Sequence, residues 1–293
     1  MKKSSYLSKD ISNKIRLISI KTHRLLRGTL AGDSRSALKG TGFEFDQIRE
    51  YQFGDDVRFI DWKASSRHNT VLVKQYIEER CRTIMLAVDV SASGIMGSHD
   101  SLKRDIFAQV ASVIALVTAL AKDRIGLILF TDQIEAYIPP ARGIRHAHTI
   151  MQKIYSYEPT RRTTHISAPL KKLAHYKQKD AVSFIISDFI DTHIDPTLLS
   201  HVAKKQELYA LRCLDMNERA LGNFGFIPIE DSETGKQSLL DMRRNNSINS
   251  YLKERIEKQA KLFKQKGVRL LDIANNETFI SDLVRFFRRR MQY

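Results

Sequence analysis

The segment that decides the fold is Thr83-Ile84-Met85-Leu86-Ala87-Val88-Asp89-Val90-Ser91-Ala92-Ser93. Its unbroken apolar run, bounded by polar residues, is typical of a central parallel strand that helices cover on both faces. Asp89, Ser91 and Ser93 follow at alternate positions where this strand ends. Because ligands bind at the carboxyl ends of the strands in an open α/β sheet, the segment predicts a site at that edge. The simpler alternative is a tight turn in which Asp and Ser bind their own backbone.

Two later segments strengthen the prediction of a site. The stretch Asp89 to Ser93 resembles the first motif of the metal-ion-dependent adhesion site of von Willebrand factor A domains, in which an Asp and two Ser hold one divalent cation. The remaining motifs of that family are matched in order by Thr163-Thr164-His165-Ile166, before a helix, and by Phe184-Ile185-Ile186-Ser187-Asp188, which ends a second buried strand. The resemblance implies a metal site made of Asp89, Ser91, Ser93, Thr164 and Asp188.

The ligand types indicate which metal to expect. Carboxylate and hydroxyl oxygens suit hard cations, so we expect Mg²⁺, with Mn²⁺ as the second choice. Two departures from the family pattern bear on the ligands: Gly94 stands where relatives often carry Met, and Arg161-Arg162 stand where relatives commonly have Gly. The choice between Thr163 and Thr164 therefore stays open.

A second resemblance lies upstream. The segments Gly42-Phe43-Glu44-Phe45, Arg49-Glu50-Tyr51 and Gly54 to Lys63 look like the signature of a bacterial family named domain of unknown function fifty-eight. Opposite charges crowd around the single Trp62 in this stretch. We interpret them as an ion-paired platform with Trp62 as a buried anchor, and the alternative is a cluster of catalytic acids.

The order of the segments predicts an α/β fold. Strands alternate with helices, which indicates a doubly wound, mostly parallel sheet with helices on both faces, of the von Willebrand factor A type. The strands expected at 124–130 and 134–138 would add an antiparallel edge. We expect this domain over residues 81–293 and an N-terminal accessory segment over residues 1–80. A basic amphipathic helix from Asp10 to Gly28 should dock on its own domain rather than on a membrane or a phosphate.

Composition narrows the class of protein. The chain has 293 residues, 42% of them hydrophobic and 28% charged, which is typical of a globular protein. Its longest apolar run, Val110 to Ala121, is too short to cross a bilayer, and its first residues lack the apolar core of a secretory signal. We therefore expect no membrane span, a cytoplasmic location, and reduced, buried thiols at Cys81 and Cys213. The net charge of +15 favours acidic partners of any kind.

These features favour recognition over catalysis. A site made mostly of neutral hydroxyls leaves its cation able to bind an acidic side chain of a partner protein, and relatives of this kind tend to be linked to MoxR-type AAA+ ATPases. We therefore expect a non-catalytic adaptor. The alternative is a metal-dependent nuclease that uses Asp89, Asp188, Asp191 and Asp195, or a nucleic-acid-binding protein, and metal-dependent cleavage would distinguish it. The histidines at 146, 148, 165 and 175 lack the spacing of zinc ligands.

Overall fold

The chain forms two compact units, one made of residues 32–81 and the other of residues 1–31 together with 82–293. The computed structural model describes residues 11–22, 44–68, 70–77, 82–91, 103–176, 181–190, 194–214, 226–230, 237–241, 245–274, 280, 283 and 286. The helix at 11–22 thus groups with the larger unit, whereas the sequence had placed it in the accessory segment 1–80. The boundary of the accessory segment itself stays a prediction.

The larger unit is built on the six-stranded sheet that the sequence predicts. Its strands lie in the order β10-β7-β6-β3-β4-β5. They are β3 (Thr83–Asp89), β4 (Arg124–Phe130), β5 (Ile134–Ala141), β6 (Ala181–Ser187), β7 (Glu207–Leu214) and β10 (Arg269–Ala274). All neighbours are parallel except β4 and β5, which form the antiparallel edge. The central position of β3 confirms that the quoted segment organises the domain.

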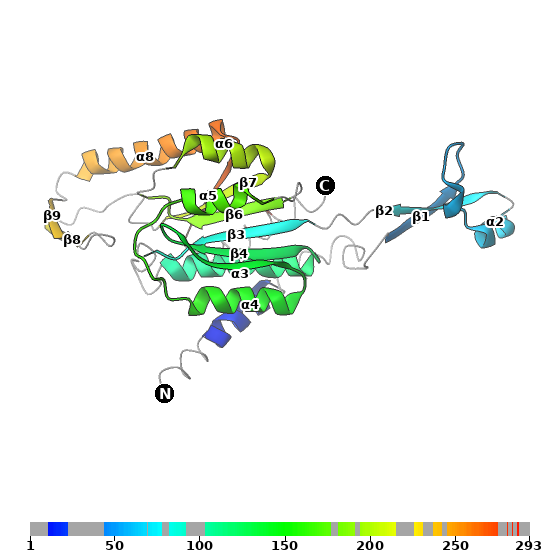
Figure 1. Cartoon of the computed structure of the whole chain (residues 1–293), viewed down its shortest axis with the longest axis horizontal. Coiled ribbons are helices and arrows are strands. Elements are labelled where there is room, and N and C mark those ends of the chain that lie inside the picture. Colours follow the sequence, from blue (N-terminus) through cyan, green and yellow to red (C-terminus); the bar gives the residue numbers. More distant parts are fainter. Residues whose placement is uncertain are drawn as a thin grey trace. The chain divides into compact units, whose positions relative to one another are not determined.

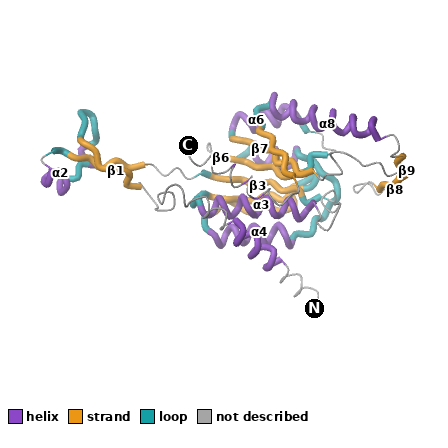
Figure 2. The backbone as a smooth tube through the Cα atoms, turned by 180° about the vertical axis from the view of Figure 1, so that it is seen from behind, coloured by secondary structure: helices purple, strands orange, loops and turns teal. Residues whose placement is uncertain are grey.

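Helices cover both faces of this sheet (Figure 1). One face packs against α3 (Lys103–Leu120) and α4 (Ile144–Ser156), and the other against α5 (Ser167–Ala174), α6 (Pro196–Lys205) and α8 (Asn245–Gln265). Alternate side chains of β3 enter the two cores: Leu86 and Val88 join the first, and Met85 and Ala87 join the second. The view from behind shows the same three layers (Figure 2). A strand that is apolar at every position is therefore buried on both sides.

The helix at 11–22 docks on the first face, as predicted. Ile18 is 6% exposed and belongs to the same core as α3, and Thr22 is fully buried. On its polar side, Lys14 Nζ lies 3.0 Å from Asp105 Oδ1 of α3. The helix is therefore a component of the domain, and its basic residues line the outer surface. Its expected continuation to Gly28 lies outside the described residues, as do Asp10 and Cys81.

The smaller unit contains an antiparallel hairpin of β1 (Glu44–Glu50) and β2 (Leu72–Ile77). The 3-10 helix η1 (Val57–Phe59) and the helix α2 (Trp62–His68) lie between these strands. Its acids are engaged in ion pairs: Asp55 with Arg49, Asp56 with Arg58, and Asp61 with Lys74. The hydrogen bonds from Arg49 hold the pKa of Asp55 down to about 2. These acids behave as structural anions, which favours the platform over a catalytic cluster.

Trp62 differs from the expectation. Its side chain is 69% exposed, and α2 contains no buried residue. Val73 is the buried hydrophobic residue among the described positions of this unit. A two-stranded hairpin with one short helix cannot enclose a side chain as large as tryptophan, because it has too few residues to form a core. This unit by itself therefore does not bury Trp62, and the role of Trp62 as an anchor between the N-terminal segment and the sheet stays a prediction.

The remaining elements agree with the sequence. The expected insertion is an antiparallel hairpin of β8 (Phe226–Glu230) and β9 (Gln237–Asp241). Cys213 is a buried free thiol on β7, and burial raises its pKa. Within the described ranges, no helix has the length and apolar character that crossing a bilayer requires. The buried helix α3 is covered by protein on nearly every side.

Gly126 of β4 supplies a test of the packing between the central strands and the sheet edge. A Cβ at this position would lie 2.8 Å from Met85 Sδ, 2.9 Å from Pro140 Cγ and 3.1 Å from the Ile138 carbonyl oxygen. We expect Gly126→Ala to lower the free energy of unfolding by about 1 to 3 kcal/mol, because overpacking forces β5 away from β4. Urea unfolding measures this change. A variant whose unfolding curve keeps the wild-type midpoint and slope would show that β4 and β5 can move apart at no cost in free energy.

Candidate metal site at the carboxyl edge of the sheet

Two buried carboxylates meet at the carboxyl edge of the sheet. β3 and β6 are adjacent and parallel, with Val88 paired to Ile186. Asp89 at the end of β3 and Asp188 just after β6 therefore leave the sheet at the same edge. They are 1% and 4% exposed. The sequence predicts this meeting correctly, because parallel strands deliver their last residues to a common edge.

Asp89 is held by neighbours on both sides. Its Oδ1 accepts the Ser91 backbone N–H at 2.9 Å, and its Oδ2 accepts the Ser187 hydroxyl at 2.8 Å. Burial, followed by the nearby negative charge of Asp188, raises the pKa of Asp89 to about 7. The carboxyl group is thus costly to ionise unless a positive charge lies beside it. A divalent cation would provide such a charge.

Asp188 already has a cation beside it. Lys103 Nζ lies 3.2 Å from Asp188 Oδ2, and the two side chains are 6% and 4% exposed. Lys103 is the first residue of α3, where the helix dipole disfavours a positive charge. The sequence analysis missed this residue. The signal that could have found it is a lysine at the start of an otherwise apolar helix, directly after the first motif.

The structure favours Thr164 over Thr163 as the threonine of the site. Thr164 is 7% exposed and Thr163 is half-buried. The next residue, His165, donates its backbone N–H to the Thr131 carbonyl at 3.1 Å, which fixes the segment against the end of β4. Thr164 Oγ1 is buried and has no hydrogen-bond partner among the described residues. A buried hydroxyl without a hydrogen-bond partner is costly.

The loop that carries Thr164 is fixed by Glu135 of β5. Glu135 accepts hydrogen bonds from the hydroxyls of Thr131, Tyr157 and Thr160 at 2.7 to 2.9 Å. Partial burial raises the pKa of Glu135, but these hydrogen bonds outweigh burial and hold it below its ordinary value. Arg161, which replaces the glycine of relatives, pairs with Asp132 at 2.9 Å. The departure from the family pattern therefore helps to fix the loop.

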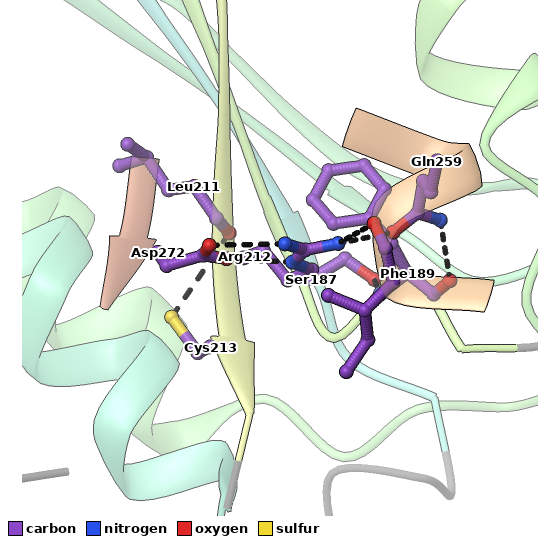
Figure 3. Close-up of polar contacts among 8 residues, drawn as sticks. Ser187, Phe189, Leu211, Arg212, Cys213, Gln259 and Asp272 are labelled. Carbon is purple, nitrogen blue, oxygen red and sulfur yellow. Dashed lines mark hydrogen bonds and ion pairs between the residues drawn. The ribbon is translucent and has the colours of Figure 1, made fainter. Parts of the chain in front are cut away.

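The loop after Asp188 is held from the other face by α8 (Figure 3). Gln259 Nε2 donates to the Phe189 carbonyl at 2.8 Å, and Arg255 donates to the Ile190 carbonyl at 2.8 Å. Arg212 of β7, which is 2% exposed, donates to Gln259 Oε1 and pairs with Asp272 of β10 at 2.6 Å. Phe189 has a positive φ of 54°, a backbone conformation that costs energy for a large residue. Sequence reasoning missed these supports, because they join segments far apart in the chain.

The other predicted residues fall into three groups. Ser91 is 2% exposed at the end of β3. Ser93, Gly94 and Asp191 lie outside the described residues. Asp195 accepts the backbone N–H groups of Thr197 and Leu198 and caps α6. The structure thus brings Asp89, Ser91 and Asp188 to one edge beside the Thr164 loop, and it gives Asp195 a structural role.

The donor set fits a hard cation. Over the described ranges, no group of three or more His, Cys, Asp and Glu side chains gathers, so a cation at this edge would depend on hydroxyls and two carboxylates. Oxygen ligands of this kind suit Mg²⁺, which retains several waters. The unpartnered Thr164 hydroxyl and the high pKa of Asp89 are both what a site designed for a positive charge shows.

The comparison with protein families identifies the chain. The model described as "Protein of unknown function DUF58" matches residues 47–261. The chain belongs to this family. The match includes the segment from Gly54 to Lys63 and all the candidate site residues. A relative from Mycobacterium tuberculosis, an uncharacterized protein, is 26% identical over 286 residues, which cover 94% of this chain and 88% of the relative.

Solved structures of low sequence identity have a similar fold. BatB from Bacteroides thetaiotaomicron has a TM-score of 0.50 at 12% identity, over 72% of this chain and 99% of that chain. An aerotolerance-related membrane protein from Bacteroides fragilis has a TM-score of 0.47 at 14% identity, over 71% and 98%. The von Willebrand A domain of SpRpn10 has a TM-score of 0.39 at 11% identity, over 71% and 95%.

These comparisons also correct the predicted location. The sequence analysis placed the protein in the cytoplasm because it found neither a signal nor a membrane span. The similar structure from Bacteroides fragilis is named a membrane protein, which contradicts that prediction. The absence of a spanning helix from the described residues does not fix where a protein acts. The cytoplasmic assignment is therefore withdrawn.

Asp89 makes the stability of the metal-free protein depend on pH. Its pKa of about 7 in the folded state exceeds its ordinary value of 3.8, so the folded protein binds this proton more tightly than the unfolded chain. Its contribution to stability therefore falls as the pH rises from about 4 to 7, by up to about 4 kcal/mol. We expect Asp89→Asn in EDTA to unfold at a higher denaturant concentration than the wild type at pH 7.5. Equal pH slopes for the two proteins would show that Asp89 ionises freely.

Lys103 should be needed most when no metal is present. We expect Lys103→Met in EDTA to lose about 3 to 5 kcal/mol of stability, because Asp188 is left buried without a cation. Mg²⁺ should restore more stability to this variant than to the wild type, since a ligand that binds only the folded state stabilises it. Thermal unfolding with and without Mg²⁺ measures both effects. A variant that Mg²⁺ fails to stabilise would mean that no cation can neutralise Asp188 from solution.

Proposed function

We propose that this protein is a non-catalytic interaction module that binds a protein partner through a divalent cation. The ligands are Asp89, Ser91, Ser93, Thr164 and Asp188, and the cation is Mg²⁺ or Mn²⁺. The single observation that carries the proposal is the buried, unpartnered Thr164 hydroxyl at the edge where two buried carboxylates emerge. A hydroxyl in that setting gains its missing interaction when a cation binds.

The charges around the site explain why it would bind an acid. Asp89 resists ionisation in the absence of metal, and Asp188 is neutralised by Lys103. A divalent cation adds two positive charges to a site that already contains the Lys103 ammonium, so the rim keeps an excess of positive charge. The cation supplies a coordination position for an acidic side chain of the partner. Asp or Glu on a partner surface is the ligand that this charge balance favours.

Lys103 also has a role in the metal-free protein. Its ammonium lies beside Asp188 where both groups are buried, so it keeps the edge folded without metal. Burying an unpaired carboxylate would cost several kcal/mol, on the order of 3 to 5. The metal-free protein is therefore a stable folded form, and metal binding changes the charge of the rim rather than creating the fold.

The partner follows from the resemblance stated for the sequence. Relatives of this family tend to be linked to MoxR-type AAA+ ATPases, and we propose such an ATPase as the partner in assembling or maturing another complex. The nuclease alternative gains no support, because Asp195 caps α6 and is not directed to a second metal. A nucleic-acid partner is not proposed for the metal rim.

The test is metal-dependent binding of a purified partner. We expect the full chain to bind the MoxR-type ATPase of the same organism in Mg²⁺, and to lose at least about tenfold in affinity in EDTA, since the bridging cation is removed. Thr164→Ala and Asp89→Ala should show the same loss with Mg²⁺ present. Biolayer interferometry with immobilised full-length protein measures these affinities.

The matched control is Ser183→Ala. Ser183 is a buried serine in the middle of β6 whose hydroxyl bonds Gln206, away from the rim. This variant should bind as the wild type does. Binding that survives EDTA and the Thr164 change would refute a metal-bridged contact. Metal-dependent cleavage of DNA or RNA that Asp89→Ala abolishes would favour the nuclease.

A further inference from the structure

The positive charge of this protein is not spread over the whole chain. The unit at residues 32–81 contains nine Asp and Glu and eight Lys and Arg, so it has one more acid than base. The net charge of +15 therefore arises entirely in the larger unit. At the carboxyl edge of that unit, cations are matched by acids, including Asp89, Asp105, Asp132, Glu135 and Asp188. The unmatched cations must therefore lie elsewhere on the larger unit.

The topology gathers cations at the opposite edge of the sheet. Parallel strands begin there, and α5, α6 and α8 end there. Because β5 is antiparallel, its last residue Ala141 pairs with Ile125 and brings the start of α4 to the same edge. Six exposed cations lie along this edge, and we name them the basic edge: Arg124, Arg142, Arg145, Lys171, Lys204 and Lys264.

Contacts confirm that the helix ends converge. Lys205 at the end of α6 donates to the Ala174 carbonyl at the end of α5. A methyl group at Gly267, just after α8, would lie 3.9 Å from Ala203 Cβ of α6. On the other face, His146 Nε2 of α4 lies 2.9 Å from the Ile125 carbonyl oxygen at the start of β4. The ends of α5, α6 and α8 and the start of α4 thus lie at the same edge of the sheet.

Lys171 lies close enough to Asp195, the cap of α6, to help lower the pKa of that carboxyl group, and few other acids oppose these cations among the described residues of this edge. Asp123 is 9% exposed and accepts the Arg82 backbone N–H at 2.9 Å. Glu207 is exposed and lies 3.9 Å from Arg269, another cation. Among the described residues, exposed cations therefore outnumber exposed acids at this edge, while acids gather at the carboxyl edge of the same sheet.

Helix dipoles explain only part of this pattern. Lysines in the last turn of a helix stabilise it, which accounts for Lys171, Lys204 and Lys264. Arg145 lies in the first turn of α4, where the dipole disfavours a cation, and Arg124 and Arg142 belong to no helix. The helix dipoles therefore do not account for three of the six cations.

The shape of the basic edge favours a planar polyanion. It spans six strands spaced about 4.8 Å apart, roughly 24 Å, and it also extends across the helices on both faces. A nucleic acid would require a stripe of cations, and for single strands an aromatic stacking platform. The large exposed apolar residue between Arg142 and Arg145 is instead the aliphatic Ile144, which is 40% exposed. An aliphatic side chain among cations suits the boundary between headgroups and acyl chains.

We propose that the basic edge binds the phosphate surface of an anionic lipid bilayer. The negative potential of such a surface attracts nearby cations, and the attraction weakens as salt screens it. Bound in this way, the protein holds its carboxyl edge away from the lipid and toward partners in solution. The proposal requires no metal and does not depend on the function proposed for the rim.

The experiment is co-sedimentation of the full chain with vesicles in EDTA. Vesicles of phosphatidylcholine alone are compared with vesicles that contain about 30% phosphatidylglycerol, an anionic fraction that gives a strong surface potential. We expect binding to the anionic vesicles only, and loss of binding as salt rises. The triple variant K171Q/K204Q/K264Q should bind on the order of 100-fold more weakly, since each lysine near the surface contributes about fivefold.

The matched control removes three exposed cations from other positions. K253Q/K258Q/R162Q changes the net charge by the same amount. Lys253 and Lys258 lie in the middle of α8, and Arg162 lies at the carboxyl edge. This control should weaken binding by less than about threefold. Circular dichroism and thermal unfolding of both variants establish that they are folded.

Three results would overturn the proposal. Equal losses in the two triple variants would show that total charge, and not the basic edge, drives binding. Failure of the folded wild type to sediment with anionic vesicles at low salt would exclude a lipid surface. Binding to duplex or single-stranded DNA that K171Q/K204Q/K264Q abolishes, without vesicle binding, would assign the edge to nucleic acid.

Discussion

The pairing of β3 with β6 is the constraint on which the rest of the structure depends. It makes two apolar strands parallel neighbours, so each delivers its first polar residue to the same buried edge. Asp89 and Asp188 are then close enough for the charge of one to raise the pKa of the other. Two buried carboxylates side by side are unfavourable unless cations or hydrogen-bond donors surround them. The surrounding contacts offset this cost.

Each of these stabilising contacts comes from a different part of the chain. Lys103 supplies a positive charge from α3, and Ser187 supplies a hydroxyl to Asp89 from the last residue of β6. Gln259 of α8 binds the carbonyl of Phe189 and so fixes the loop after Asp188. Thr164 is the exception, because its buried hydroxyl has no partner among the described residues. The contacts from Lys103, Ser187 and Gln259 therefore offset part of the cost of burying the two carboxylates.

The two edges of the sheet differ in charge for the same topological reason. In a parallel sheet the strands end at one edge, where helices begin, and the helices end at the other edge. Acids at Asp105 and Asp195 lie at the starts of α3 and α6, and lysines at Lys171 and Lys204 lie near the ends of α5 and α6. This distribution follows the helix dipoles. A single architecture thus yields an acid-lined rim and a basic edge that face opposite directions.

The sequence by itself determined the strands, the order of the motifs and the meeting of Asp89 with Asp188, because apolar runs and parallel connections are local or topological properties. It also determined the family, because the residues from Gly54 to Lys63 are contiguous. The role of Trp62 as an anchor to the sheet stays a prediction, because the smaller unit by itself leaves this side chain exposed. Only the tertiary structure decided the pairing of Lys103 with Asp188, since these residues are 85 positions apart and meet through packing. Thr163 and Thr164 are adjacent and equivalent in sequence, and only the tertiary structure distinguishes them, because it buries Thr164 more deeply than Thr163.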